Sequence, residues 1–135
     1  MQEHRIEFHE TKSIPPDNLR GLYEANGWSS ARGPELLARA IANSHSVVSA
    51  WHGERLVGLG NTLSDGLMVV YYLHLLVHPY YQRKCVGSAI ARRLMARYHN
   101  FHQQVLLAEG SAAGFYRKMG FERATSIEPM WQAGF

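Results

Sequence analysis

The sequence predicts an α+β domain with a mixed, mostly antiparallel β-sheet flanked by about four helices, and three observations lead to this class. The chain has 135 residues, 46% hydrophobic and 19% charged, which suits one globular domain over residues 1–135. Three strand-like segments follow one another before the middle of the chain. After them the pattern changes to helix, strand and helix.

The N-terminal segment predicts one strand and two helices. Residues 5–9 alternate between polar and apolar side chains and predict a short strand. A helix is expected from Pro15 to Asn26-Gly27, and a second begins near Pro34, because proline suits the first turn of a helix. The expected buried face of the first helix is Leu19, Leu22 and Tyr23. That of the second helix is Leu37, Ala40 and Ile41.

Three sequential strands are expected over residues 47–51, 56–62 and 68–77. The segment His52–Arg55 between the first two is a hairpin signal, and Asp65-Gly66 predicts a turn before the third. These short connections favour antiparallel neighbours.

The remaining pattern is a helix over residues 87–98, a strand over 104–108 and a helix over 111–119. Ser111 is the expected N-cap of the last helix, and Gly120 is placed to end it in a left-handed conformation. The tail from Glu122 to Phe135 is expected to form one or two edge strands, with a break at Pro129. Such an edge would offer a surface for a homodimer.

Charge, cysteine content and hydropathy argue against several classes of protein. A net charge of +3 and a pI near 9.2 are mild, and a nucleic-acid-binding module would show a longer basic stripe. One cysteine permits no internal disulfide. No segment approaches the ~20 apolar residues of a membrane span, and no secretory signal is visible. We therefore expect a cytoplasmic protein without nucleic-acid or membrane partners.

The strongest functional signal is the polar loop that leads from the third strand into a helix. Residues 82–89 end where backbone N–H groups have no intrahelical partner. These donors, the helix dipole and the cations Arg83 and Lys84 favour a phosphate-bearing ligand. Neither G-x-x-x-x-G-K-[ST] nor G-x-G-x-x-G occurs, so an ordinary strand-to-helix connection is the alternative interpretation.

Two segments resemble motifs of the GNAT acyl-CoA N-acetyltransferases. Residues 75–89, LLVHPYYQRKCVGSA, resemble motif A, whose loop pattern Q/R-x-x-G-x-G/A follows a strand ending in an apolar-x-Val step. Residues 113–121, AGFYRKMGF, resemble the family's A-x-x-F-Y-x-x-x-G-F segment. With one helix and one strand between the two motifs, the resemblance covers nearly the whole chain.

The resemblance implies acetyl-CoA as co-substrate and a GNAT-like fold whose splayed central strands admit its pantetheine arm. The diphosphate would lie on the amides of Arg83 to Ser88, and the pantetheine along residues 75–77. A bulge in the long strand would aim the N–H of Leu75 or Leu76 at the thioester carbonyl. The implied cofactor contacts are Leu75, Leu76, Val77, Gln82, Arg83, Lys84, Cys85, Val86, Gly87, Ser88, Ala89 and Tyr116.

The implied reaction is transfer of the acetyl group to a primary amine by direct attack in a ternary complex. Tyr116 matches the general acid that protonates the CoA thiolate, although its spacing also suits an amphipathic-helix tyrosine beside Phe115. His74 is the best-placed candidate for a general base, and a packed strand histidine is the alternative reading of it. Glu109 and ordered water are the other candidate bases.

Cys85 departs from the family pattern, because it occupies the position of the first glycine. A side chain at this position is compatible with weaker cofactor binding. It is equally compatible with a loop that tolerates the side chain without effect on the cofactor. It is also compatible with a reactive thiol or with a small, partly buried filler. The departure keeps a second function open, a catalytically weak or inactive relative that binds CoA or a partner protein.

The acceptor is expected to be a small-molecule amine or a protein amine. Residues 28–32, Asp65 and the tail near Met130 are expected to border its pocket, with Trp28 as the first candidate. The chain has eight histidines, but the closest pair, His99 and His102, lacks a third ligand, and no metal site is expected.

Overall fold

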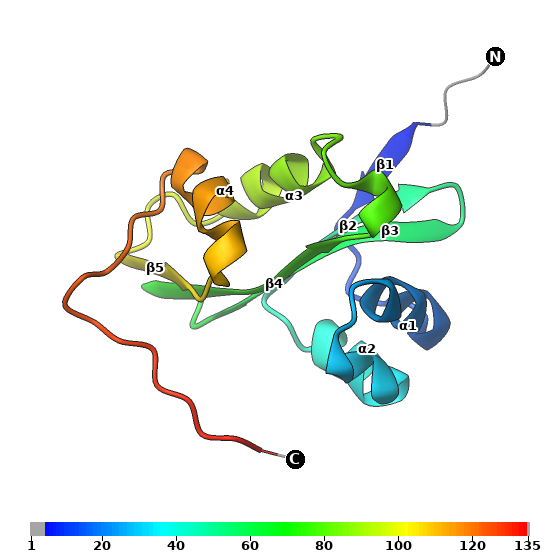
Figure 1. Ribbon diagram of the computed structural model, residues 1–135, viewed down its shortest axis with the longest axis horizontal. Coiled ribbons are helices and arrows are strands. Elements are labelled where there is room, and N and C mark those ends of the chain that lie inside the picture. The colour runs from blue at the N-terminus through cyan, green and yellow to red at the C-terminus, as the bar shows by residue number, and fades with distance from the viewer. Residues whose placement is uncertain (1–4, 135) are drawn as a thin grey trace.

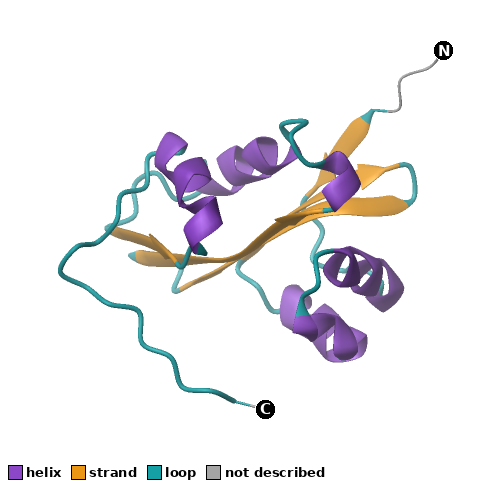
Figure 2. Ribbon diagram, in the orientation of Figure 1, coloured by secondary structure: helices purple, strands orange, loops and turns teal. Residues whose placement is uncertain are grey.

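The computed structural model describes residues 5–134 and shows a five-stranded sheet with helices on both faces (Figures 1 and 2). The strands are β1 (Ile6–His9), β2 (Ser46–His52), β3 (Arg55–Ser64), β4 (Val69–Val77) and β5 (Gln103–Leu106). The α-helices are α1 (Pro16–Ala25), α2 (Pro34–Ala42), α3 (Val86–Met95) and α4 (Ala113–Lys118). Three 3-10 turns connect them, η1 (Ser29–Arg32), η2 (Pro79–Tyr81) and η3 (Gly110–Ala112).

The sheet has the order β1-β2-β3-β4-β5, and the predicted mixed, mostly antiparallel arrangement is confirmed. The first four strands are antiparallel neighbours, and β5 runs parallel to β4. The predicted hairpin is a two-residue turn at Gly53 and Glu54, where Gly53 has a φ of 60°. Glycine takes this left-handed conformation without the penalty that a Cβ atom brings.

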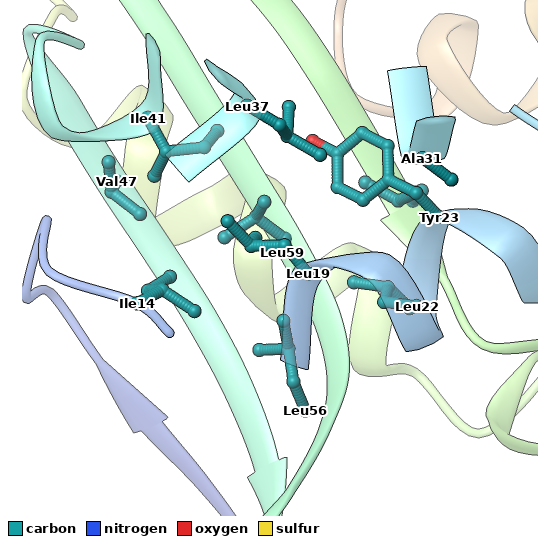
Figure 3. Packing of buried hydrophobic residues seen from close by; sticks show 11 residues of the cluster. Ile14, Leu19, Leu22, Tyr23, Ala31, Leu37, Ile41, Val47, Leu56 and Leu59 are labelled. Carbon is teal, nitrogen blue, oxygen red and sulfur yellow. The ribbon is translucent and has the colours of Figure 1, made fainter. Parts of the chain in front are cut away.

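One face of the sheet is covered by α1 and α2 (Figure 3). The predicted stripe of α1 is confirmed, because Leu19, Leu22 and Tyr23 are buried. In α2 the prediction is wrong at one position, since Ala40 is exposed and Ala38 packs against the cluster. The buried face of α2 therefore includes Leu37 and Ala38 and excludes Ala40. The whole cluster is Ile14, Leu19, Leu22, Tyr23, Ala31, Leu37, Ile41, Val47, Leu56, Leu59 and Leu76.

The opposite face of the sheet is covered by α3. This helix approaches β3 closely because the β3 residues that face it include glycines. A Cβ atom on Gly60 would lie 2.7 Å from Ile90 Cγ2 and 2.8 Å from Leu94 Cδ1. A Cβ atom on Gly58 would lie 2.9 Å from Ile90 Cδ1. These glycines set the depth at which the helix sits on the sheet, and therefore the position of the loop at its N-terminus.

Gly60→Ala is expected to lower the free energy of unfolding by about 1–3 kcal/mol, because the added methyl group overpacks the contact with α3. Gly21→Ala is the matched control. Nothing lies within 4 Å of a Cβ atom at this exposed helical position, and alanine should stabilise α1 by about 0.5–1 kcal/mol. Urea denaturation of both variants measures the difference. Equal effects would show that α3 can move away from β3 at little cost.

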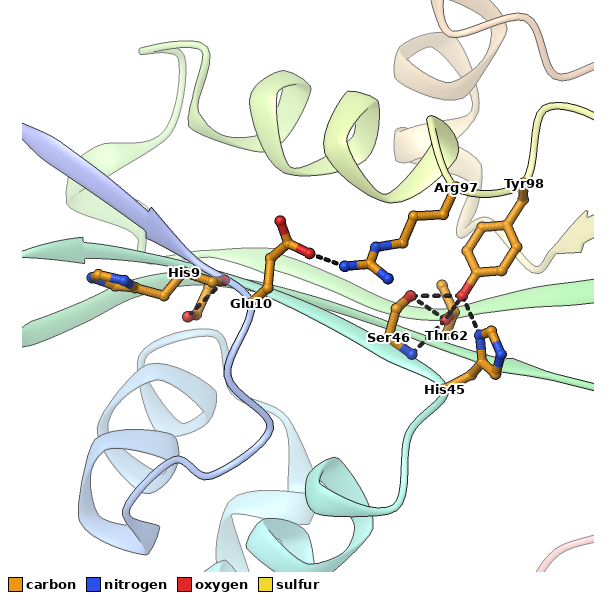
Figure 4. A network of polar contacts seen from close by, with 8 residues as sticks. His9, Glu10, His45, Ser46, Thr62, Arg97 and Tyr98 are labelled. Atoms are coloured by element: carbon orange, nitrogen blue, oxygen red, sulfur yellow. Dashed lines mark hydrogen bonds and ion pairs between the residues drawn. The ribbon is translucent and has the colours of Figure 1, made fainter. Parts of the chain in front are cut away.

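The helix α3 ends at Met95, earlier than predicted, because Tyr98 turns into a buried polar network (Figure 4). The Tyr98 hydroxyl lies 2.7 Å from Ser46 Oγ, 2.7 Å from Thr62 Oγ1 and 2.6 Å from His45 Nδ1. A buried hydroxyl without partners is costly, whereas this one is fully used. These hydrogen bonds hold the segment after α3 against β2 and β3.

The last helix, α4, begins later than predicted, and Ser111 is not its N-cap. Ser111 lies within η3, and no side chain caps the first turn of α4. The predicted helix end is confirmed. Gly120 has a φ of 101°, and the Phe121 amide donates to the Tyr116 carbonyl at 3.1 Å, as in a Schellman motif.

The prediction of edge strands in the C-terminal tail is wrong for residues 122–134, which form no strand, and Phe135 lies outside the described residues. Pro129 has no N–H to donate, and the one backbone hydrogen bond within this segment is a local one from the Ile127 amide to the Ala124 carbonyl. The side chains of Met130 and Trp131 are 94% and 86% exposed. The edge strand on which the expected dimer surface depended is therefore absent from residues 122–134.

Candidate active site

A gap opens between β4 and β5, because the two strands pair over only part of the length of β4. The parallel ladder joins residues 69–72 of β4 to residues 103–106 of β5. Beyond Tyr72, β4 continues to Val77 without a paired strand on that side. The predicted splay of the central strands is thus present, and residues 73–77 leave one edge of β4 open.

A bulge in β4 turns the backbone at the start of this gap. Asn61 pairs with His74 and Thr62 with Tyr72, so Leu73 is an extra residue in the ladder with β3. The His74 amide donates to Asn61 Oδ1 at 3.0 Å, and the His78 amide donates to the Val57 carbonyl at 2.8 Å. Both amides face β3.

The amides along β4 alternate in direction, so the amide of residue 76 also faces β3. The amides of Leu75 and Val77 then face the gap. Of the two residues predicted to present an N–H to a ligand, Leu75 fits the geometry and Leu76 does not. Leu76 instead contributes its side chain to the core beneath α1 and α2.

The gap contains a mostly apolar pocket to which β4, α3, β5 and α4 all contribute. Tyr116 on α4 lines this pocket together with Leu75 and His74, so the structure brings the three predicted catalytic positions to one cavity. Burial raises the pKa of Tyr116 above its usual value, which keeps the phenol protonated at neutral pH. The full lining is Tyr72, His74, Leu75, Ala91, Leu94, Met95, Leu106, Tyr116, Met119 and Phe121.

The loop before α3 presents a row of free backbone N–H groups. No hydrogen bond joins the amides of residues 83–88 to another described residue, and no side chain caps α3. The Ala89 amide donates to the Cys85 carbonyl at 3.1 Å, so the row ends at Ser88 and excludes Ala89. Six amides at the positive end of a ten-residue helix favour an anionic ligand.

The loop takes this shape because two of its residues adopt left-handed backbone conformations. Arg83 has a φ of 64° and Cys85 a φ of 65°. Such values are uncommon outside glycine. Glycine would be the natural residue at position 85, because it adopts positive φ values without strain. Cys85 adopts the same backbone conformation although it carries a side chain.

The polar side chains of the loop are engaged to different degrees. Gln82 donates from Nε2 to the Val77 carbonyl at 2.9 Å and so ties the loop to the end of β4. The Lys84 ammonium lies 5.0 Å from the ring centre of Tyr80, an orienting cation–π contact. Arg83 is exposed, and no ion pair of its side chain is found among the described residues. Of the two cations in this loop, Arg83 is therefore the one without such a contact among the described residues.

Cys85 is exposed and is not the partly buried filler that was one alternative. Cys85→Gly is expected to raise the free energy of unfolding by up to about 1 kcal/mol, because glycine removes the left-handed strain. Ser88→Gly, at an ordinary position in α3, should lower it by about 0.5–1 kcal/mol. Thermal or urea denaturation compares the two variants. Destabilisation by both would mean that Cys85 is not strained.

His74 lies at the pocket wall on the α1 side of the sheet. Its Nδ1 atom is 2.9 Å from the Tyr23 hydroxyl, and its ring meets Trp28 edge to face at a centroid distance of 5.2 Å. Burial lowers the pKa of His74, so the imidazole is neutral at pH 7. Tyr23 was identified from the sequence only as a core residue. A contact between residues 51 positions apart leaves no local signal that could have assigned it to the site.

Several other candidates are not brought to this pocket. Glu109 is exposed and does not line it, and Met130 lies in the exposed tail. Asp65 Oδ1 accepts from the amides of residues 67, 68 and 69, which lowers its pKa to about 2 and commits it to its own turn. Of the predicted acceptor border, Trp28 is the residue that contacts His74.

Two features are absent from the described residues. Among residues 5–134 no three His, Cys, Asp or Glu side chains gather as metal ligands would. Within the same range, no helix combines the length and the apolar content of a membrane span.

Comparison with known proteins places this geometry in a family. Residues 13–130 match the family model described as acetyltransferase (GNAT) domain. The chain is similar to a protein of Glycine max named histone acetyltransferase TAP1, with 30% identity over 131 residues, 87% of this chain and 56% of that protein. The chain therefore spans little more than half of the length of this curated relative.

Solved structures share the fold. A GNAT-family acetyltransferase from Streptococcus pneumoniae TIGR4 superposes with a TM-score of 0.81, at 28% identity, covering 97% of this chain and 98% of that one. AAC(6')-Iy in complex with the bisubstrate analogue CoA-S-monomethyl-acetylneamine superposes with a TM-score of 0.72, covering 96% and 99% of the two chains. Because the sequence identity is 11%, this similarity is evidence for a shared fold alone. On the strength of the family match, this chain belongs to the GNAT family of acetyltransferases.

Proposed function

We propose that this chain transfers the acetyl group of acetyl-CoA to a primary amine, by direct attack of the amine within a ternary complex. The observation that carries the proposal is the row of six free amides at residues 83–88 beside an open gap between β4 and β5. GNAT enzymes generally use acetyl-CoA, whose diphosphate and thioester need two such neighbouring sites.

The loop and the open strand edge fit the two ends of the co-substrate. The amides of residues 83–88 would hold the diphosphate, with Arg83 and Lys84 supplying positive charge. The pantetheine would lie along residues 75–77, where the amides of Leu75 and Val77 lack a β-sheet partner. In this arrangement the pantetheine pairs with β4 much as an added strand would.

The transfer itself needs three groups around the thioester. The amine nitrogen attacks the carbonyl carbon, a C–N bond forms, and the C–S bond breaks. The Leu75 N–H would stabilise the oxyanion that develops on the carbonyl oxygen. Tyr116 would give its proton to the departing thiolate, and its raised pKa keeps that proton in place until it is needed. The proton that the amine must lose goes to His74 or to ordered water.

A second function, a relative that binds CoA without catalysis, is favoured by one observation. Cys85 adds a side chain at the loop position where the family pattern has glycine, next to the row of amides. The two functions differ in one measurable respect. Acetyl transfer releases free CoA in the presence of an amine, whereas binding alone does not.

The test is thiol release after acetyl-CoA is mixed with a panel of amines. Because the curated relative is named a histone acetyltransferase and one structural neighbour is in complex with CoA-S-monomethyl-acetylneamine, the panel includes a lysine peptide and neamine. A peptide N-terminus, a free amino acid and a small alkylamine complete it. Amine-dependent release supports the transferase. Saturable acetyl-CoA binding with no release for any amine would establish the binding function instead.

A further inference from the structure

The pair formed by Tyr23 and His74 has a defined direction of hydrogen bonding. Tyr23 is 0% exposed, and among the described residues its hydroxyl has one polar partner, His74 Nδ1 at 2.9 Å. The ring of Trp28 meets both rings edge to face, at centroid distances of 5.5 Å from Tyr23 and 5.2 Å from His74. The three rings hold each other in place between α1, η1 and β4.

The proton on the buried phenol decides which nitrogen of His74 carries a hydrogen. A buried O–H that donates to nothing is costly, and Nδ1 is the acceptor within reach. Burial also raises the pKa of Tyr23, so the phenol keeps its proton. Since Tyr23 donates to Nδ1, the neutral imidazole must carry its own proton on Nε2.

We infer that Tyr23 is a positioning residue that holds His74 as a hydrogen-bond donor, through Nε2–H, on the α1 side of the sheet. His74 is among the residues that line the pocket, its Nδ1 atom is occupied by Tyr23 of α1, and no hydrogen bond to Nε2 is found among the described residues, so Nε2 is the ring nitrogen left for a ligand. This inference rests on the proposed function. It selects water, not His74, as the group that takes the proton from the amine, because Nε2–H has no lone pair to offer.

The His74 N–H group also defines the class of amine substrate that fits the site. The Leu75 amide is the donor for the thioester oxygen, so the His74 N–H is available for an oxygen of the other substrate. The acceptor that fits is an amine with a carbonyl or carboxylate oxygen near it, as in an amino-acid amide or a peptide N-terminus. An alkylamine of the same shape without that oxygen leaves the donor without this hydrogen bond, which lowers the affinity for the amine.

The first test reads the imidazole directly and does not depend on activity. Long-range ¹H–¹⁵N NMR of the His74 ring should show the Nε2–H form in the wild-type protein at neutral pH. Tyr23→Phe should mix the two neutral forms and raise the pKa of His74, because the hydrogen bond to Nδ1 that favours the neutral ring is lost. An Nδ1–H ring in the wild type, or an unchanged ring in Tyr23→Phe, would overturn the inference.

Tyr98→Phe is the matched control for this experiment. It also removes the hydroxyl of a buried tyrosine that contacts a histidine, His45, but it leaves the Tyr23 hydroxyl in place. This variant should lose stability and leave the His74 ring signals unchanged. If it changed them as Tyr23→Phe does, the effect would be a general loosening of the fold, and the positioning role would be refuted.

The second test separates a donor from a base by kinetics. His74→Gln keeps an N–H donor, whereas His74→Ala keeps none. With alaninamide as acceptor, kcat/KM should stay within about fivefold of wild type for glutamine and fall by roughly 10- to 100-fold for alanine. With isopropylamine, which lacks the carboxamide, His74→Ala should cost less than about threefold.

The possible failures are distinguishable. Equal losses for glutamine and alanine, or equal losses for the two amines, would refute the donor role while acetyl transfer itself stands. If the wild-type protein acetylated no amine and the NMR spectra still showed the Nε2–H form, the proposed function would fail. The tautomer fixed by Tyr23 would then remain as a structural result.

Discussion

Tyr116→Phe is expected to lower kcat for acetyl transfer by roughly 10²- to 10³-fold and to change the Kd for acetyl-CoA by less than about threefold. The phenol lines the pocket between β4 and β5, and phenylalanine fills the same space without the proton. Without a general acid the thiolate must leave unprotonated, which raises the barrier of the transfer and not the cost of binding. Steady-state kinetics and calorimetric titration with acetyl-CoA measure the two quantities.

Tyr80→Phe is the control for this substitution. Tyr80 is 72% exposed on η2, so removal of its hydroxyl should leave kcat unchanged. If Tyr116→Phe kept wild-type kcat at saturating amine, the general-acid role would be wrong. The tyrosine would then be a helix residue that packs against Phe115 and Phe121 and nothing more.

Arg83→Glu is expected to raise the Kd for acetyl-CoA by about 10- to 30-fold at low ionic strength, and by less in salt, because exposed charges are screened. The side chain is exposed beside the six free amides and has no ion-pair partner among the described residues. A carboxylate at this position both removes an attraction and adds a repulsion. It would also compete for the amides that the diphosphate needs.

Arg39→Glu changes the net charge by the same amount on α2, which packs on the other face of the sheet (Figure 1). This control should leave the Kd for acetyl-CoA within about twofold of wild type, since a distant surface charge is screened beyond about 8–10 Å. A similar loss for both variants would mean that overall charge, and not the loop at residues 83–88, governs binding of the co-substrate.

Local patterns predicted the parts of the fold that depend on neighbours in sequence. The stripe of α1, the hairpin at Gly53 and the left-handed end of α4 at Gly120 all follow from spacing or from a single glycine. The loop before α3 was also predictable, because a helix N-terminus leaves free amides wherever it occurs. The contacts that determine these features join residues only a few positions apart in the sequence.

The rest depends on contacts that the sequence does not encode locally. The pairing of Tyr23 with His74 joins α1 to β4, and the choice of Leu75 over Leu76 depends on a bulge at residue 73. The prediction for the tail failed for a different reason. Edge strands were expected there, but a strand needs a partner edge, and residues 122–134 join none.

A crystal structure of this chain with acetyl-CoA bound would show directly whether the co-substrate occupies the amides before α3 and the open edge of β4. We expect diphosphate oxygens about 2.7–3.2 Å from amide nitrogens within residues 83–88, with the thioester carbonyl at the same distance from the Leu75 nitrogen. The Tyr116 hydroxyl should face the sulfur. A co-substrate bound elsewhere, or a ladder between β4 and β5 that closes over residues 73–77, would rule out this mode of binding.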